Sequence, residues 1–189
     1  MNRIITEILE AGIAAKREFI KENIPKIEQA AGLLADTLDR GNKILLFGNG
    51  GSAADCQHIA AEFVNRFRLE RSPLAAMALT TDTSVLTSIG NDYSFDEIYS
   101  KQVEALGRKG DVALGISTSG NSPNVIRAVD AALSKGLHVI GFSGKAGLLK
   151  DRSGIAFCVN SETTARIQEV HIFLAHILCD LTERILFDA

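Results

Sequence analysis

Two ionisable side chains stand four residues apart in a segment with helical spacing. His58 and Glu62 fall within residues 52–66, and an α-helix completes a turn about every 3.6 residues, so both side chains leave the same face. An imidazole and a carboxylate at that spacing can bind a divalent metal ion, or the carboxylate can act as a base. Spacing alone also fits an ordinary solvated ion pair, which is the simpler interpretation.

A glycine-rich turn comes directly before this helix. Residues 48–55 are Gly-Asn-Gly-Gly-Ser-Ala-Ala-Asp and match G-x-G-x-x-A, a pattern whose glycines let backbone amides approach an anion at a helix N-terminus. A dinucleotide site also needs an acidic residue near the end of the second strand. Glu70 has that spacing but precedes the strand, so an NAD-dependent oxidoreductase is the weaker interpretation.

A second turn carries a dense set of hydroxyl groups. Residues 115–123 are Gly-Ile-Ser-Thr-Ser-Gly-Asn-Ser-Pro and are spaced like a P-loop, except that Asn121 stands where the phosphate-binding lysine would be. Hydroxyls, small-residue amides and a helix N-terminus suit a single phosphate monoester. Ser122 taken alone is more simply an N-cap before Pro123. Capping explains the other hydroxyls at 117–119 less well.

The C-terminal segment 163–186 predicts one long helix that carries Gln168, His171 and His176. His171 is expected to be a core histidine. Gln168 and His176 are eight residues apart, so on one helix they are separated by about 12 Å and point about 80° apart. If both serve one site, they come from different subunits. The apolar residues of this helix cover more than one face, and we expect the terminal helices to pack between subunits.

The remaining pattern predicts an α/β fold in a single domain, residues 1–189, with a helical segment at 1–40 and the sheet with its flanking helices at 41–189. Helical spacing recurs at 96–106 and 122–135, and the first forty residues are expected to form helices interrupted near Pro25. The turn at Asn91 and Asp92 is a further polar corner, or simply a turn with an N-cap. Five short runs predict strands that are buried on both faces of a parallel sheet, at residues 43–47, 74–79, 111–116, 138–142 and 155–159.

Composition excludes several classes of protein. Of 189 residues, 46% are hydrophobic and 23% charged, which is typical of a globular protein and not of a disordered one. The 20 basic and 23 acidic residues are interspersed, so no basic stripe indicates nucleic-acid binding. No apolar run is long enough for a membrane span, and the N-terminus lacks a signal-peptide pattern. Three widely spaced cysteines suit a reducing compartment, and we expect a cytoplasmic protein.

Taken together, these segments resemble the sugar isomerase (SIS) domain family, and within it the bacterial phosphoheptose isomerases. The matching segments span nearly the whole chain in order: 48–55 with His58 and Glu62, 80–82, 90–92, 115–122, and 165–169 with His171 and His176. The resemblance implies a five-stranded parallel sheet in a flavodoxin-like three-layer sandwich, with extra N-terminal helices and a long C-terminal helix. It also implies a homotetramer whose active sites are shared between subunits.

The activity implied by the resemblance is the isomerisation of sedoheptulose 7-phosphate to D-glycero-D-manno-heptose 7-phosphate through an enediol, for surface-glycan heptose. Glu62 would be the base and His176 the acid. A zinc ion would be held by His58, Glu62, Gln168 and His176. The residues that match substrate-binding positions of the family are Asn49, Gly50, Gly51, Ser52, Asn91, Asp92, Ser117, Thr118, Ser119, Ser122 and Gln168.

The sequence departs from the family pattern at Ala165, where some members have an aspartate, and at residues 145–150, which are less glycine-rich than usual. The main alternative is a non-catalytic SIS relative, either an adaptor of a replication-initiation protein or a sugar-phosphate sensor. Such relatives lack the acid and base together. Because this chain has both Glu62 and His176, the isomerase is the favoured prediction.

Overall fold

The computed structural model describes residues 1–187 and contains one sheet of five parallel strands in the order β2-β1-β3-β4-β5. This is the flavodoxin-like order, as predicted. Every residue of β1 and β3 is buried, because helices cover both faces of the sheet. The strands are β1 (Ile44–Gly48), β2 (Ala76–Ala78), β3 (Val112–Ser117), β4 (His138–Ser143) and β5 (Ile155–Cys158).

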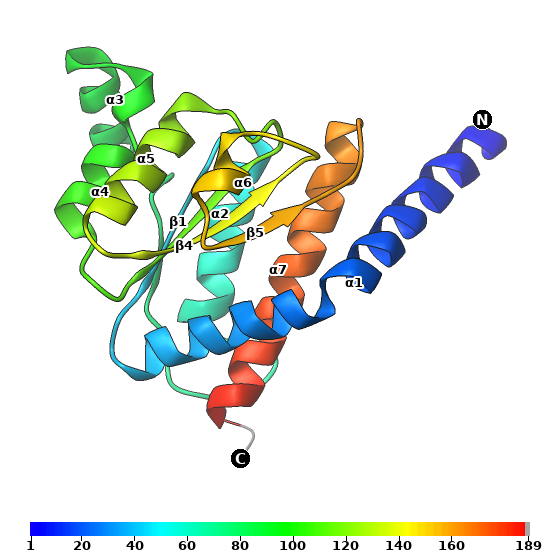
Figure 1. Ribbon diagram of the computed structural model, residues 1–189, viewed down its shortest axis with the longest axis horizontal. Helices are drawn as coiled ribbons and strands as arrows, with labels where there is room; N and C mark the ends of the chain where they lie inside the picture. Colours follow the sequence, from blue (N-terminus) through cyan, green and yellow to red (C-terminus); the bar gives the residue numbers. More distant parts are fainter. Residues whose placement is uncertain (188–189) are drawn as a thin grey trace.

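Helices form two outer layers (Figure 1). The helices are α1 (Asn2–Asp39), α2 (Gly51–Val64), α3 (Thr83–Asp92), α4 (Ser100–Leu106), α5 (Pro123–Ser134), α6 (Leu148–Arg152) and α7 (Thr164–Phe187), with a 3₁₀ turn η1 (Phe95–Glu97). One hydrophobic core joins the sheet to α1, α2 and α7, and a second joins the opposite face to α4, α5 and α6. The predicted three-layer sandwich is therefore confirmed.

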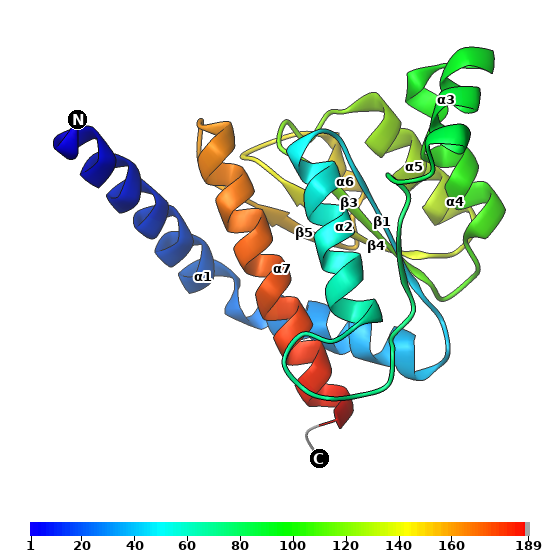
Figure 2. The same ribbon diagram turned by 180° about the vertical axis from the view of Figure 1, so that it is seen from behind.

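The N-terminal forty residues form one helix, not the interrupted pair that was expected near Pro25. Pro25 lies inside α1, and the helix axis changes direction in that part of the chain (Figures 1 and 2). Proline removes one backbone donor and crowds the preceding turn, which bends a helix without always ending it. The C-terminal half of α1 packs on the core, whereas the N-terminal half projects beside α7.

Two helices were not predicted. Residues 83–92 form α3, in which Asp82 is the N-cap and accepts a hydrogen bond from the Val85 amide at 3.0 Å. Leu86 and Ile89 of α3 are partly buried against the second core, but the helix has only 10 residues, a length at which periodicity is a weak signal. Residues 148–152 form the short α6. The second strand is also shorter than predicted, since only Ala76–Ala78 pair with β1.

Helix α7 lies between α1 and α2, as Figure 2 shows from behind. Neighbours within the same chain therefore bury many of its apolar residues, among them Ile167, Val170, Leu174 and Leu178. Exposed apolar side chains occur on several elements, including Ile185 and Phe187 at the end of α7, but they are most concentrated on the projecting half of α1, where Ile4, Ile5, Ile8 and Leu9 are each more than half exposed. No helix in residues 1–187 is long and apolar enough to cross a membrane.

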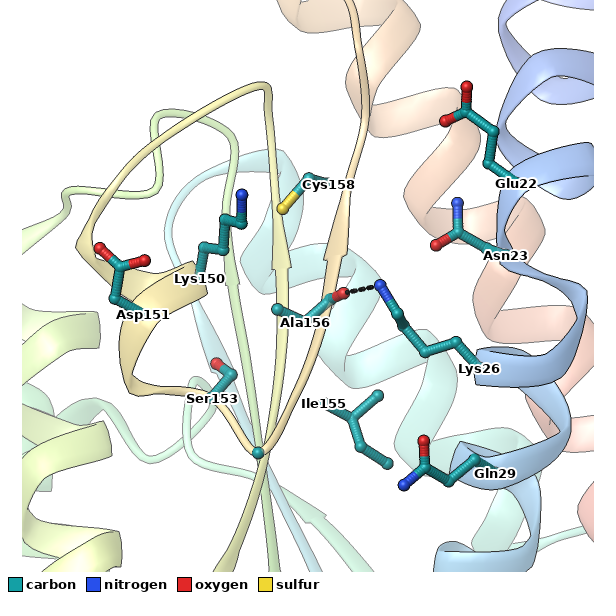
Figure 3. Close-up of a pocket in the computed structure, with 11 residues that line it drawn as sticks. Glu22, Asn23, Lys26, Gln29, Lys150, Asp151, Ser153, Ile155, Ala156 and Cys158 are labelled. Carbon is teal, nitrogen blue, oxygen red and sulfur yellow. Dashed lines mark hydrogen bonds between the residues drawn. The ribbon is translucent and has the colours of Figure 1, made fainter.

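The sheet ends at an edge strand, β5, and a cavity of about 510 Å³ opens between β5 and α1 (Figure 3). Lys26 of α1 donates from Nζ to the Ala156 carbonyl at 3.0 Å, which pairs one of the free groups of this edge. None of the residues with predicted catalytic or binding roles lines this cavity.

Candidate active site

The two predicted phosphate turns meet at the carboxyl edge of the sheet. Strands β1 and β3 pair in parallel, with Gly48 opposite Ile116, so the loops that follow them leave the sheet side by side. The strand order reverses direction between these two strands, and ligands of open α/β sheets bind in the crevice at such a point. The turn at 48–52 and the turn at 117–122 are thus brought together as the pattern predicted.

Side chains from the two loops fix this crevice. Asn49 donates from Nδ2 to Asn124 Oδ1 at 2.8 Å, and Asn124 Nδ2 donates back to Asn49 Oδ1 at 2.8 Å. Gly50 has a φ of 57°, a conformation that other residues rarely adopt, and it leads the chain into α2. The side chain of Asn49 therefore holds the start of α2 against the start of α5. Asn124, which is buried, was not predicted as a site residue.

The second loop gathers three hydroxyl groups. Ser117 Oγ lies 2.9 Å from Ser122 Oγ and 3.3 Å from Ser119 Oγ, and Ser119 Oγ accepts from the Asn121 amide at 3.1 Å. Ser122 is the N-cap of α5 by position, but its side chain makes no capping hydrogen bond. The prediction of Ser122 as the N-cap before Pro123 is therefore confirmed by position, but capping does not account for the direction of its hydroxyl. The Ser122 hydroxyl faces the other serines, so it does not accept a hydrogen bond from the first amides of α5.

Gly120 allows this loop to close against its neighbour. Its φ is 68°, and a Cβ there would collide with the carbonyl oxygen of Ala146. The side chain of Asn121 adds a second tie, since its Oδ1 accepts from the Leu148 amide at 3.0 Å. The hydroxyl cluster thus stands on a packed base formed by residues 144–148.

The ionisable residues of α2 and α7 form a second group. His58 Nε2 lies 2.9 Å from Glu62 Oε1 and 3.5 Å from His176 Nε2, and one ligand atom from each of the three residues falls within 4.8 Å of the others. The His58 side chain is 46% exposed and that of Glu62 23% exposed, so solvent reaches the group. The base and acid of the sequence-based hypothesis therefore lie next to each other in one chain.

Aromatic rings fix the orientation of His176. The Phe67 ring stacks on its imidazole at a centroid distance of 5.5 Å, and the His58 ring meets it edge-on at 5.1 Å. One helical turn before His58, burial raises the pKa of the Asp55 carboxyl, although the nearby His58 and His176 act to lower it. Asp55 therefore takes up a proton more readily than an ordinary aspartate.

Gln168 does not join this group within the chain. It faces the first turn of α2, where a Cβ on Gly51 would lie 2.7 Å from Gln168 Nε2. A cavity of about 310 Å³ lies there, lined by Gly51, Asp55, Ala165, Gln168, Glu169 and Ile172. Because α2 and α7 run side by side, Gln168 lies next to the start of α2, whereas His176 lies next to the later turns of α2.

The other predicted residues lie at the sheet edge or beyond it. Ser52 is buried in the first turn of α2, and Thr118 is half-buried in the hydroxyl loop, where its carbonyl accepts from the Gly144 amide at 3.0 Å. Asn91 and Asp92 are exposed in the last turn of α3, so the interpretation of these residues as a turn followed by an N-cap is wrong. Asn91 Nδ2 donates to Asp92 Oδ1 at 2.8 Å.

His171 is a core histidine, as predicted. It is 1% exposed, and its Nε2 lies 3.0 Å from the Ser143 carbonyl, which can only accept. Burial lowers the pKa of His171 to about 4, while the bond to Ser143 acts to raise it. The imidazole is therefore neutral at physiological pH and takes no part in the exposed group.

Comparison with known proteins gives a family. A family model described as SIS domain matches residues 9–144. A phosphoheptose isomerase of Nitratidesulfovibrio vulgaris is 52% identical over 187 residues, which cover 98% of this chain and 90% of that protein. This chain belongs to the phosphoheptose isomerases of the SIS domain family. A phosphoheptose isomerase of Aquifex aeolicus is also 52% identical, over 95% of this chain and 94% of the relative.

Solved structures of phosphoheptose isomerases match this chain over nearly its full length. The structure from Neisseria gonorrhoeae has a TM-score of 0.87 and 50% sequence identity, and it covers 96% of this chain and 97% of its own. The structure from Francisella tularensis has a TM-score of 0.92 and 39% identity, with the same coverage. The long C-terminal helix and the five-stranded sheet are thus features of the family fold.

Sequence reasoning missed a buried ion pair next to the site of this phosphoheptose isomerase family member. Arg71 Nε donates to Glu183 Oε1 at 2.9 Å, and both side chains are 1% exposed. Burial acts to raise the pKa of Glu183, but hydrogen bonds from the amides of residues 67–69 and from Arg71 together lower it. A weak signal was present: Glu183 is seven residues after His176 and so lies on the same face of α7.

Proposed function

We propose that this phosphoheptose isomerase family member converts sedoheptulose 7-phosphate to D-glycero-D-manno-heptose 7-phosphate. The observation that carries the proposal is the group formed by His58, Glu62 and His176, in which a carboxylate and an imidazole lie together and open to solvent. The names and lengths of the relatives add support, because the chain spans 90% of the N. vulgaris phosphoheptose isomerase.

The reaction needs one proton to move between two carbons. Glu62 removes a proton from C1 of the open-chain ketose, and the C1–C2 enediol forms as the C2 oxygen gains a proton. The same carboxylate returns a proton to C2 while the C1 hydroxyl loses one, which gives the aldehyde. His176 serves as the acid and base at the oxygens and assists ring opening. No electrons leave the substrate, so the isomerisation needs no redox cofactor.

The phosphate would bind at the carboxyl edge of the sheet. Ser52, Ser117, Ser119 and Ser122 supply hydroxyls, and the first turns of α2 and α5 supply amides and the positive end of the helix dipole. Asn49, Gly50, Gly51 and Thr118 complete this crevice, and Asn91, Asp92 and Gln168 contact the sugar.

We propose that zinc is the cofactor. The donor set suits it, since two imidazole nitrogens and a carboxylate oxygen converge within 4.8 Å. The observed 3.5 Å between His58 Nε2 and His176 Nε2 is close to the spacing of about 3.3 Å expected for two ligands of a tetrahedral zinc. His58, Glu62 and His176 would hold the ion, with Gln168 as a fourth ligand. When bound, zinc would polarise substrate oxygens as a Lewis acid. Because a tightly ligated carboxylate is a poorer base, either the ion would have a structural role or its ligation by Glu62 would loosen during turnover.

Two copies of the chain would build each site. Ser52 and Glu62 are ten residues apart, so about 15 Å of α2 separates the phosphate crevice from the proton-transfer pair. Gln168 lies at the crevice end of its own chain, beside Gly51. A neighbouring copy that presents its crevice and Gln168 to this chain's His58, Glu62 and His176 would complete both the metal set and the substrate pocket.

The assembly we propose is a homotetramer. The exposed apolar side chains of the projecting half of α1 (Ile4, Ile5, Ile8, Leu9 and Ile13) form a surface that a second copy can cover. The proposed compartment is the cytoplasm, because Cys56, Cys158 and Cys179 are all free thiols. The product would supply heptose for surface glycans.

Isotope exchange tests the proposed activity. Purified protein incubated with sedoheptulose 7-phosphate in D₂O is expected to introduce deuterium at C1 and C2 of the recovered sugars, because the enediol exchanges its carbon-bound proton with solvent. Glu62→Gln is expected to abolish exchange while sugar-phosphate binding persists. Glu70→Gln, at an exposed carboxylate in the same region, is the matched control and is expected to retain activity. An unlabelled sugar with the wild-type protein would favour the adaptor or sensor.

A further inference from the structure

A buried ion pair lies beneath the proton-transfer pair. The segment 65–75 leaves the end of α2, passes across α7 and returns to β2 (Figure 2). Glu183 of α7 accepts hydrogen bonds from three consecutive amides of this segment, those of Phe67 at 2.7 Å, Arg68 at 2.9 Å and Leu69 at 3.0 Å. One carboxylate thus sets the course of the backbone where it crosses the helix.

Arg71 connects the same carboxylate to the end of α2. Its Nε donates to Glu183, one terminal nitrogen donates to the Phe63 carbonyl at 2.7 Å, and the other donates to the Glu62 carbonyl at 2.8 Å. The last carbonyls of a helix have no partner within the helix and carry its negative dipole end, which a guanidinium satisfies. Arg71 therefore caps the turn that carries the proposed base.

The pair reaches the proposed acid through an aromatic ring. Phe67, whose amide is held by Glu183, stacks its ring on the His176 imidazole at a centroid distance of 5.5 Å. The His58 ring also contacts the His176 ring, edge-on. Movement of the segment would release one face of the His176 ring, and movement of Arg71 would release the end of α2 at Glu62.

We propose that Arg71 and Glu183 are positioning residues for catalysis, which act through the Phe67 ring on His176 and through the end of α2 on Glu62. They touch neither the substrate nor the reacting atoms. Their role is to keep an imidazole on α7 and a carboxylate on α2 in one fixed arrangement. The inference rests on the proposed function, because it assigns these two residues to the proton-transfer pair of that reaction.

A second ion pair with an equally buried carboxylate supplies a matched control. Lys43 Nζ donates to Asp111 Oδ2 at 2.6 Å, and the Asp111 carboxylate also accepts from the Lys43 and Arg108 amides. Asp111 is 1% exposed, as Glu183 is, yet it lies at the start of β3, at the end of the sheet opposite the hydroxyl loop. Asp111→Asn therefore removes the charge from a comparable carboxylate without touching Phe67, His176 or the end of α2.

The experiment compares four variants by thermal unfolding, kcat and KM. At a temperature where all are folded, Glu183→Gln and Phe67→Leu are expected to lower kcat by about tenfold with KM within about twofold of wild type, since misplaced catalytic groups affect turnover more than binding. Phe67→Tyr keeps the ring and is expected to retain kcat, as is Asp111→Asn. Should Glu183→Gln fail to fold, the kcat of Phe67→Leu compared with that of Phe67→Tyr tests the inference instead.

Two results would overturn the inference: equal loss of kcat in Phe67→Leu and Phe67→Tyr, or no greater loss in a folded Glu183→Gln than in Asp111→Asn. If wild-type protein does not isomerise the sugar, the proposed function fails, and Zn²⁺ affinity measured against a competing chelator carries the test. Phe67→Leu is then expected to weaken Zn²⁺ binding relative to Phe67→Tyr, because the ring orients a ligand. Unchanged Zn²⁺ affinity would refute the positioning role.

Discussion

Mixing inactive variants tests how the active site is divided between copies of the chain. Glu62→Gln removes the base, and Ser119→Asp places a carboxylate among the hydroxyls of the phosphate loop, where Ser119 is exposed and can accept the change. If the introduced carboxylate lies about 4 Å from the phosphate, the repulsion is roughly 4 kcal/mol per unit of phosphate charge at an effective dielectric constant of 20. The affinity for the sugar phosphate should therefore fall by at least about a hundredfold. Each variant alone is expected to be inactive.

If the crevice of one chain faces the Glu62/His176 pair of another, a random mixture of these two variants restores about a quarter of the sites, because each site draws its two halves independently. A mixture of Glu62→Gln with His176→Gln should restore none, since both side chains come from the same chain. Activity is measured after mass spectrometry has verified subunit exchange. A mixture of wild type with Glu62→Gln is the reference, because about half of its sites are expected to be active. Recovery in the second mixture, or none in the first, would refute this division of the site.

Three further predictions concern the metal, the assembly and the core. His58→Gln is expected to weaken Zn²⁺ binding by at least about tenfold in a chelator competition, and unchanged affinity would contradict the zinc site. Ile8→Asp on the exposed face of α1 should give a smaller species in sedimentation and lose activity, whereas a tetramer of full activity would argue against that interface. His171 has a pKa lowered from 6.5 to about 4, so the folded state loses about 3 kcal/mol as pH falls through that window, because the unfolded chain binds the proton first. His171→Gln should flatten that part of the stability profile measured by urea unfolding, and an equal slope would show that His171 is not the cause.

The parts of the fold that follow from local chemistry were predicted well. Strands β1 and β3 are runs of apolar residues, and α2 and α5 begin at glycine or Ser-Pro signals, so their positions were found to within a few residues. Helix α3 was missed because it has only 10 residues and its core-facing residues, Leu86 and Ile89, are only partly buried, so periodicity is a weak signal there. The bend in α1 was predicted as a break because proline does not reveal whether tertiary contacts carry the helix past it.

The candidate site divides in the same way. The spacing of His58 and Glu62 follows from the helix period, and the separation of Gln168 from His176 follows from the rise per residue, so both were predictable from the chain alone. The contact between His176 and His58 joins residues 118 positions apart. No local pattern encodes such a contact, since it depends on how α7 packs against α2.

The sequence by itself determined which residues could carry the chemistry, because residue type and short-range spacing fix what a side chain can do and which face of a helix it leaves. Only the tertiary structure decided which of them meet. It placed Glu62 and His176 in one chain and left Gln168 at the phosphate end. It also showed that Arg71 and Glu183, two charged residues without a distinguishing motif, lie buried beneath the site. The physical reason is that burial and pairing are properties of packed elements, and a charge has no fixed partner until the chain has folded around it.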